Sequence, residues 1–291
     1  MGAAETRRFT FGGIRFACRV WAASSAAPDS AAPLILLHGF AQSAASWDGV
    51  APALAEAARR PVYAFDLVGH GESDRPADPG DYALDVQADA LLSFSRALAV
   101  DAGVRPAVLG YSMGGRVTLS ALGCDPHAFS AVVLESAGFG PATQAERDAA
   151  AERDAACAAR LRADGLEAFM DFWEQLPLFA SQRDLPSDVR ARLRAGRLAN
   201  GAEALARTFE HAGQHVMPAR AATLETLARL HANGTPLLYL AGERDAKYRA
   251  LAAQAAEAGA TVRIVSDAGH NAHLEAPAAF VRETASFFST R

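Results

Sequence analysis

The chain has 291 residues, and 51% of them are hydrophobic. This predicts one large domain, or one domain with a sizeable insertion, and ample material for a core. The net charge of −5 does not suit a nucleic-acid-binding protein, which normally carries a concentrated basic stripe. No apolar run reaches membrane-spanning length and no signal segment is recognisable, so we expect a cytoplasmic protein that binds neither nucleic acid nor membrane.

The first predicted elements are two strands, residues 6–11 and 14–21, which flank Gly12-Gly13 in the manner of a hairpin. A loop rich in Ser, Ala, Pro and Asp follows. Further on, short apolar runs without polar alternation predict strands buried on both faces, as in a parallel sheet. These runs are residues 34–37, 62–65, 107–109, 131–134, 237–240 and 262–265. Helical patterns between them, at residues 50–58, 83–99 and 115–122, supply the crossovers.

The alternation of strands and helices stops between residues 139 and 220. This stretch contains no strand-like run. It predicts four helices, at residues 144–163, 166–176, 188–198 and 202–211. We therefore predict an α/β fold whose core, residues 1–138 and 221–291, is a mostly parallel sheet flanked by helices, with residues 139–220 inserted as a helical cap.

The three cysteines, Cys18, Cys124 and Cys157, are scattered and share no metal-ligand spacing. They predict three buried thiols in a reducing compartment rather than a disulfide framework, and no metal site.

The strongest motif is Gly110-Tyr111-Ser112-Met113-Gly114, which directly follows a predicted strand and opens a predicted helix. It matches the nucleophile-elbow pattern G-x-S-x-G in the strand–turn–helix context that the motif requires. Glycines flank the serine because side chains would clash in so tight a turn. We take Ser112 as the reactive residue, and the alternative is a chance Gly-Ser-Gly loop.

A base and an acid should follow the serine in the chain. His270 comes just after the last predicted strand and is our candidate base, with His273 as its rival. Asp245 comes just after the preceding strand and is our candidate acid, because a carboxylate there can fix the imidazole tautomer. Glu243 and Glu135 are its rivals.

An oxyanion hole is expected beside Ser112. In a fold with this elbow, the loop after the first parallel strand donates one backbone N–H group, and the residue after the serine donates the other. Phe40 and Met113 are therefore the predicted donors, whereas His38 is expected to hold the loop.

Several further segments accompany these motifs. They are residues 110–116, 134–137, 172–173, 177–181, 242–248 and 268–273. Together they resemble the 2-succinyl-6-hydroxy-2,4-cyclohexadiene-1-carboxylate synthases of menaquinone biosynthesis, a family with the α/β-hydrolase fold. The resemblance implies that Ser112 acts as a base, that pyruvate is eliminated from a small carboxylated substrate, and that no cofactor is needed.

The resemblance also implies a cavity with several cations for a tricarboxylate substrate. Arg116 lies one helical turn past Ser112 and can face the same cavity. The other matching positions are Lys247, Tyr111, Gln42, Trp173 and Arg197. For Arg197 a solvated helix face is the alternative.

The sequence departs from the family pattern at Ala150, where the family has a substrate-binding arginine. Arg147 and Arg153 lie three residues to either side, near the same helix face, and could supply the charge. If neither does, the substrate differs. The alternative function is a serine hydrolase that forms an acyl-enzyme on a carboxylated substrate, and a non-catalytic binding protein is a third interpretation.

Overall fold

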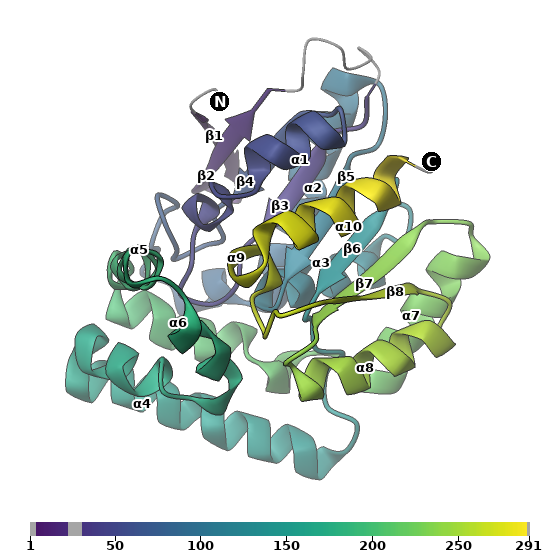
Figure 1. Ribbon diagram of the computed structural model, residues 1–291. Coiled ribbons are helices and arrows are strands. Elements are labelled where there is room, and N and C mark those ends of the chain that lie inside the picture. Colours follow the sequence, from purple (N-terminus) through teal and green to yellow (C-terminus); the bar gives the residue numbers. More distant parts are fainter. Residues whose placement is uncertain (1–3, 23–30, 290–291) are drawn as a thin grey trace.

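The computed structural model describes residues 4–22 and 31–289. Most of the predicted loop before the first parallel strand lies outside these residues. Within the described part of the chain, one eight-stranded sheet has the strand order β1-β2-β4-β3-β5-β6-β7-β8 (Figure 1). β1 and β2 form the predicted hairpin, β2 is also antiparallel to β4, and the remaining neighbours are parallel. The strands are β1 (Glu5–Phe11), β2 (Ile14–Trp21), β3 (Leu34–Leu37), β4 (Val62–Phe65), β5 (Ala107–Tyr111), β6 (Val132–Glu135), β7 (Leu237–Gly242) and β8 (Thr261–Val265).

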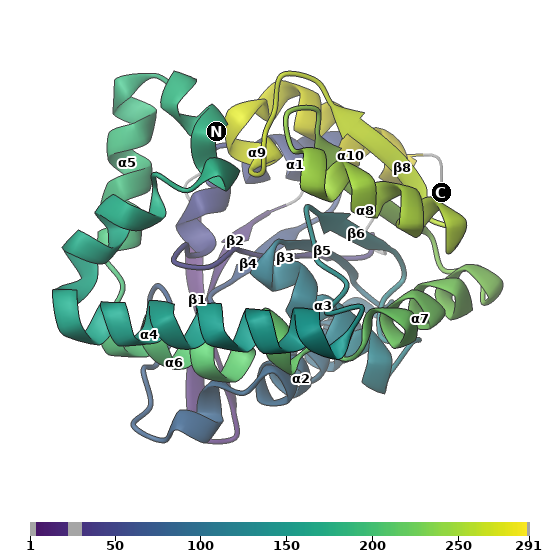
Figure 2. The ribbon, with the colours of Figure 1, turned by 90° about the horizontal axis from the view of Figure 1, so that it is seen from below.

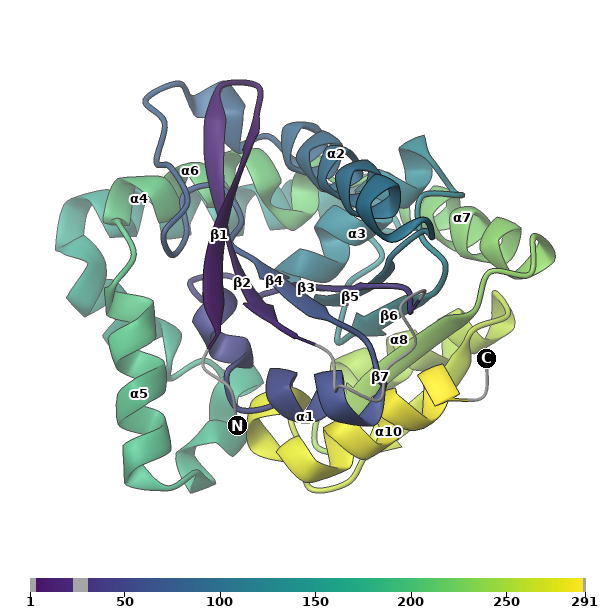
Figure 3. The same cartoon turned by 90° about the horizontal axis from the view of Figure 1, so that it is seen from above.

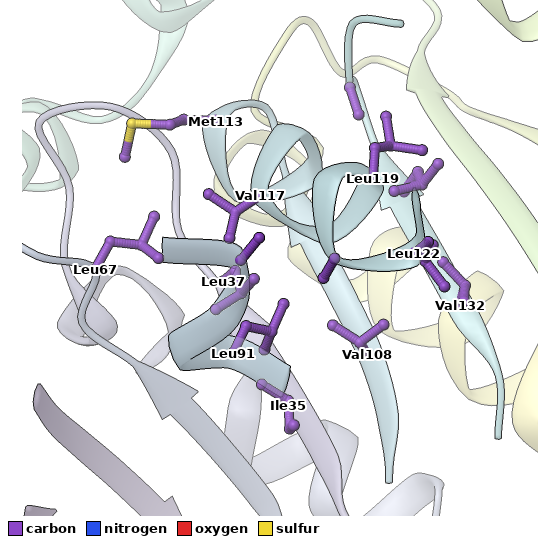
Figure 4. Close-up of a cluster of buried hydrophobic side chains, with 14 of the residues drawn as sticks. Ile35, Leu37, Leu67, Leu91, Val108, Met113, Val117, Leu119, Leu122 and Val132 are labelled. Atoms are coloured by element: carbon purple, nitrogen blue, oxygen red, sulfur yellow. The ribbon is translucent and has the colours of Figure 1, made fainter. Parts of the chain in front are cut away.

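Helices cover both faces of the sheet, which explains why the strands are continuously apolar. In β3, Leu34 and Leu36 face one core and Ile35 and Leu37 face the other. Figure 3 shows the two helical layers and Figure 4 a part of the core beneath α3. The first layer contains α2 (Leu84–Ala102), α3 (Met113–Cys124), α7 (Arg220–Ala232) and α8 (Ala246–Glu257). The second contains α1 (Ala51–Ala57) and α10 (Pro277–Ser289).

Two expectations were wrong. β8 was expected to be buried on both faces, but it is the edge strand of the sheet, and Ile264 is 41% exposed. Its only strand neighbour in the described sheet is β7, so one of its sides lacks the cover that the inner strands have. Cys124 was expected to be buried, but it ends α3 at the surface, whereas Cys18 and Cys157 are buried. All three thiols are free.

A helical segment follows β6. It contains α4 (Gln144–Trp173), α5 (Ser187–Leu198) and α6 (Ala202–Ala212), with 3-10 helices at Pro177–Asp184 and Gln214–Val216. The two helices expected first are joined into α4 across a kink at Gly165, whose φ is 79°. The three α-helices lie together beside the layered core, and α4 runs across the lower end of the molecule (Figures 1 and 2). Every residue of 139–220 is described and none is in a strand; the bounds of the cap stay a prediction.

The cap helices share a small core with the loop after β3. Ala41 of that loop is fully buried among Phe169 of α4 and Leu205 of α6. This packing brings the cap over the end of the sheet where the strands β3 and β5 stop. In the described part of the chain, no helix is both long and apolar enough to cross a membrane.

A pair of glycines in α3 tests how closely this helix packs on the sheet. A Cβ at Gly115 would lie 2.4 Å from Cβ of Ala137, whereas a Cβ at Gly123 meets nothing within 4 Å. Alanine favours a helix over glycine at both sites. We expect Gly115→Ala to lower the free energy of unfolding by about 1–2 kcal/mol through overpacking, and Gly123→Ala to raise it by about 0.5 kcal/mol. Urea unfolding of both variants checks this, and equal effects would contradict the packing.

Candidate active site

The turn at Ser112 is strained and tightly packed. Ser112 lies between β5 and α3 with φ 50° and ψ −103°, a backbone conformation that side-chain-bearing residues seldom adopt. A Cβ at Gly110 would lie 2.6 Å from the carbonyl oxygen of Gly114, and a Cβ at Gly114 would lie 2.4 Å from that of Leu37. Only glycine fits at these two positions, so the chain can turn sharply and leave the serine side chain at the end of the sheet.

The three predicted catalytic side chains are hydrogen-bonded in series. Ser112 Oγ lies 3.0 Å from His270 Nε2, and His270 Nδ1 lies 2.9 Å from Asp245 Oδ2. Because the carboxylate accepts from Nδ1–H, Nε2 of a neutral imidazole is left to accept the serine proton. His270 and Asp245 are both buried, which strengthens the interaction between the carboxylate and an imidazolium.

Strand ends bring these residues together. Asp245 follows β7 and caps α8, since its Oδ1 accepts the N–H of Tyr248 at 3.2 Å while Oδ2 accepts from His270. His270 lies in the loop between β8 and α9 (Ala272–Glu275). The rings of Tyr248 and Tyr111 flank its imidazole, with centroids 4.6 and 5.4 Å away.

The rival acids and bases are engaged elsewhere. His273 donates from Nδ1 to Glu135 Oε2 at 2.7 Å, so these two rivals bind each other. Glu243 accepts the backbone N–H of Asp267 at 3.1 Å. His38 accepts the N–H of Leu67 at 3.1 Å, and burial lowers its pKa to about 3, so it is a neutral support for its loop.

The predicted oxyanion donors lie on the two segments that meet at Ser112. The carbonyl of His38 accepts the N–H of Gly114 at 3.0 Å and holds the loop after β3 against the start of α3. Among the residues that the structure describes, the backbone N–H groups of Phe40 and Met113 have no acceptor. They are therefore available to a substrate oxygen, and their role stays a prediction.

A cavity of about 340 Å³ opens over Ser112 and His270, between the core and the cap. Most of the predicted substrate-binding residues line it: Tyr111, Arg116, Gln42, Arg153, Trp173, Arg197 and Lys247. Phe40 and Trp173 form part of an aromatic wall, with ring centroids 5.1 Å apart. The cavity also has wall residues that the sequence analysis did not assign to it, among them Asp154, Cys157, Phe209, Gln214 and Tyr248.

Arg147 is the predicted substrate-binding residue that does not reach the cavity. Its guanidinium donates to the backbone carbonyls of His215 and Met217, the latter at 2.8 Å. Ala150 is buried and does not line the cavity either. Of the two flanking arginines, only Arg153 lies at the cavity wall, where its Nη2 is 3.5 Å from Asp154 Oδ1.

Arg116 and Lys247 are cations without an anionic partner among the described residues. Within residues 4–22 and 31–289, neither side chain forms an ion pair or a hydrogen bond; Lys247 Nζ lies 5.3 Å from the centroid of the Tyr248 ring, and Arg116 Nε is buried without an acceptor. Burial lowers the pKa of Arg116, and the nearby Asp154 opposes this effect. Desolvation and the charge of Arg153 lower the pKa of Lys247, whose side chain is exposed at the cavity.

Arg197 is a cation of a different kind. Its side chain is 4% exposed, so the solvated-face alternative is wrong for this residue. It pairs with Glu174 at 3.0 Å and donates to Gln182 at 3.0 Å. Its guanidinium therefore already has an anionic partner, which Arg194 shares at 2.9 Å, although Arg197 Nε has no acceptor. The described residues contain no group of three or more His, Cys, Asp or Glu side chains placed to hold a metal.

A Ser–His–Asp series on a nucleophile elbow beneath a helical cap defines a class of enzyme, and residues 32–277 match the alpha/beta hydrolase fold family. This chain is 35% identical to the 2-succinyl-6-hydroxy-2,4-cyclohexadiene-1-carboxylate synthase of Citrobacter koseri. It is 34% identical to the synthase of the same name from Escherichia coli O1:K1. The matches cover 85% and 87% of this chain and 90% and 92% of those proteins. The chain belongs to this synthase family within the α/β-hydrolase fold.

Solved structures agree with this assignment. A structure of MenH from S. aureus is 27% identical, has a TM-score of 0.84, and matches over 94% of this chain and 98% of its own. A thermophilic esterase from Thermogutta terrifontis has a TM-score of 0.78 over 99% of both chains at 22% identity, a likeness of fold alone.

The Asp245–His270 bond can be tested by removing one charge. In Asp245→Asn, the amide can neither stabilise an imidazolium nor enforce the tautomer, so we expect kcat to fall roughly 10³- to 10⁴-fold. Glu243→Gln, in the same turn, is the matched control and should keep near wild-type turnover. A similar loss in both variants would show that Asp245 is not the acid.

Proposed function

We propose that this enzyme eliminates pyruvate from 2-succinyl-5-enolpyruvyl-6-hydroxy-3-cyclohexene-1-carboxylate to give 2-succinyl-6-hydroxy-2,4-cyclohexadiene-1-carboxylate, a step of menaquinone biosynthesis. One observation carries the proposal. The Ser112 hydroxyl, already hydrogen-bonded to a base, shares a cavity with two cations that have no anionic partner in the described chain. Unpaired cations beside a catalytic group favour an anionic substrate.

The chemistry follows from the series of hydrogen bonds. As His270 Nε2 takes the hydroxyl proton, Ser112 Oγ removes a proton from the ring carbon next to the succinyl carbonyl. The imidazolium that forms is stabilised by Asp245. The electron pair moves onto the succinyl oxygen and through the ring double bond, and the C–O bond to the enolpyruvyl group breaks. The enolpyruvate recovers a proton and becomes pyruvate, so protons balance and no cofactor is consumed.

The backbone amides of Phe40 and Met113 complete this proposal. A dienolate oxygen carries its charge where a tetrahedral intermediate would carry it in an ester hydrolase, and two fixed N–H donors stabilise either. The aromatic wall formed in part by Phe40 and Trp173 offers an apolar surface to the ring of the substrate. We assign Arg116, Lys247 and Arg153 to the carboxylates of the substrate, with Arg153 in place of the arginine missing at Ala150. The proposed compartment is the cytoplasm, which the free thiols support.

The discriminating experiment compares two reactions. Purified enzyme is given the enolpyruvyl cyclohexene substrate, and the release of pyruvate is measured. In parallel, the enzyme is given aryl esters, and their hydrolysis is measured. We expect rapid pyruvate release and negligible ester turnover. Ester turnover without pyruvate release would make the protein a serine hydrolase that uses Ser112 as a nucleophile.

Arg116 tests whether the cations recognise carboxylates. Removing one charge-assisted hydrogen bond costs about 1.5–3 kcal/mol, so Arg116→Ala should lower kcat/KM for the elimination roughly 10- to 100-fold, mainly through KM. Arg249→Ala is the control, because Arg249 is exposed on α8 and does not line the cavity. An unchanged KM in Arg116→Ala would show that Arg116 does not bind the substrate.

Lys247 should make binding sensitive to alkaline pH. Because its pKa is lowered, the amine loses its proton at a lower pH than an ordinary lysine does, and substrate binding weakens with it. We expect kcat/KM to decline as pH rises towards 10.5, and Lys247→Arg to move that decline to higher pH. A profile that is identical in both proteins would exclude this role.

A further inference from the structure

Two carboxylates hold the segment that carries His270. Glu135, the last residue of β6, is fully buried; its Oε1 accepts the N–H of His273 at 3.0 Å and its Oε2 accepts from His273 Nδ1 at 2.7 Å. Glu275, at the end of α9, accepts the N–H of Gly269 at 2.7 Å and that of Asn271 at 3.1 Å. Each carboxylate uses both oxygens, and the Glu275 bonds flank His270 on either side.

Glu135 also contacts Ser112, which forms the hydrogen bond with His270. Its backbone carbonyl accepts the N–H of Ser112 at 2.9 Å. Glu135 therefore holds the serine through its main chain and the histidine-bearing segment through its side chain. Tyr111, the neighbour of Ser112 in the chain, packs against the histidine-bearing segment. Its ring centroid lies 4.9 Å from that of His273 and 5.4 Å from that of His270. Burial and then the charges of Glu135 and Glu275 raise the pKa of Tyr111.

The geometry points to Glu135 and Glu275 as positioning residues that set the distance between Ser112 Oγ and His270 Nε2. A short loop can shift by an ångström unless its backbone is held, and such a shift at a catalytic group lowers rates by up to about 100-fold. A carboxylate can accept both N–H groups at once, whereas the single oxygen of a glutamine side chain leaves one donor unbound. The ring of His273 is fixed further by Trp47, which stacks on it at 4.0 Å.

The test uses the near-isosteric variants Glu135→Gln and Glu275→Gln. We expect kcat for pyruvate release to fall roughly 10- to 100-fold and KM to change less than twofold, because Arg116 and Lys247 lie on α3 and α8 and are not disturbed. The control is Glu257→Gln, an exposed glutamate on α8. Thermal unfolding accompanies every assay. A lowered unfolding midpoint with unchanged kcat in both variants would mean that these residues serve the fold alone, and would overturn the proposal.

The kinetic test rests on the proposed function, because it measures pyruvate release. A second measurement, the rate at which Ser112 is chemically modified, does not depend on that function. An alkyl fluorophosphonate modifies a serine according to how well its base is placed, whatever the natural substrate is. The rate of Ser112 modification, followed by intact mass, should fall with kcat in both variants. If the wild-type enzyme releases no pyruvate, the proposed function fails while this rate still decides the inference. Equal modification rates in wild type and variants would overturn it.

His273 supplies a rescue experiment if Glu135→Gln does not fold. Asparagine places an N–H donor near the position of Nδ1, so His273→Asn can keep the bond to Glu135, whereas His273→Ala loses it. We expect His273→Asn to recover most of the Ser112 modification rate that His273→Ala loses. Equal rates in the two variants would contradict the positioning role.

Discussion

The site depends on one hydrogen bond, 3.0 Å long, between Ser112 Oγ and His270 Nε2. Its two residues lie 158 positions apart, so packing between distant segments of the chain brings them together. The serine is fixed by a strained backbone that close packing around Gly110 and Gly114 maintains. Such strain persists only where the surrounding structure over-determines it. The buried sheet end therefore supplies the rigidity from which the chemistry follows.

Charge is distributed unevenly around that bond. The glutamates near the catalytic residues are engaged by backbone amides or by His273, and Arg197 forms an ion pair with Glu174. Arg116 and Lys247, in contrast, have no anionic partner in the described chain. Leaving the buried Nε of Arg116 without an acceptor costs stability, and a bound carboxylate would offset that cost.

Local patterns could be predicted from the sequence, and contacts between distant segments could not. The elbow at Ser112 was identifiable because strand, turn and helix are contiguous, and Asp245 and His270 because each follows a strand. Arg147 and Arg153 could not be separated, since both lie near one helix face. The carbonyls of His215 and Met217, about seventy residues further on, decide between them. Phe209 and Gln214 reach the cavity only because α6 packs on α4, and they carry no local signal.

The central claim is that Ser112 removes a proton from carbon instead of attacking a carbonyl. The most direct measurement is the deuterium isotope effect on kcat/KM for pyruvate release, with the label on the ring carbon next to the succinyl carbonyl. The account predicts a normal primary effect, clearly above one. An effect of one, with kcat/KM far below the diffusional ceiling of about 10⁸–10⁹ M⁻¹s⁻¹, would contradict it.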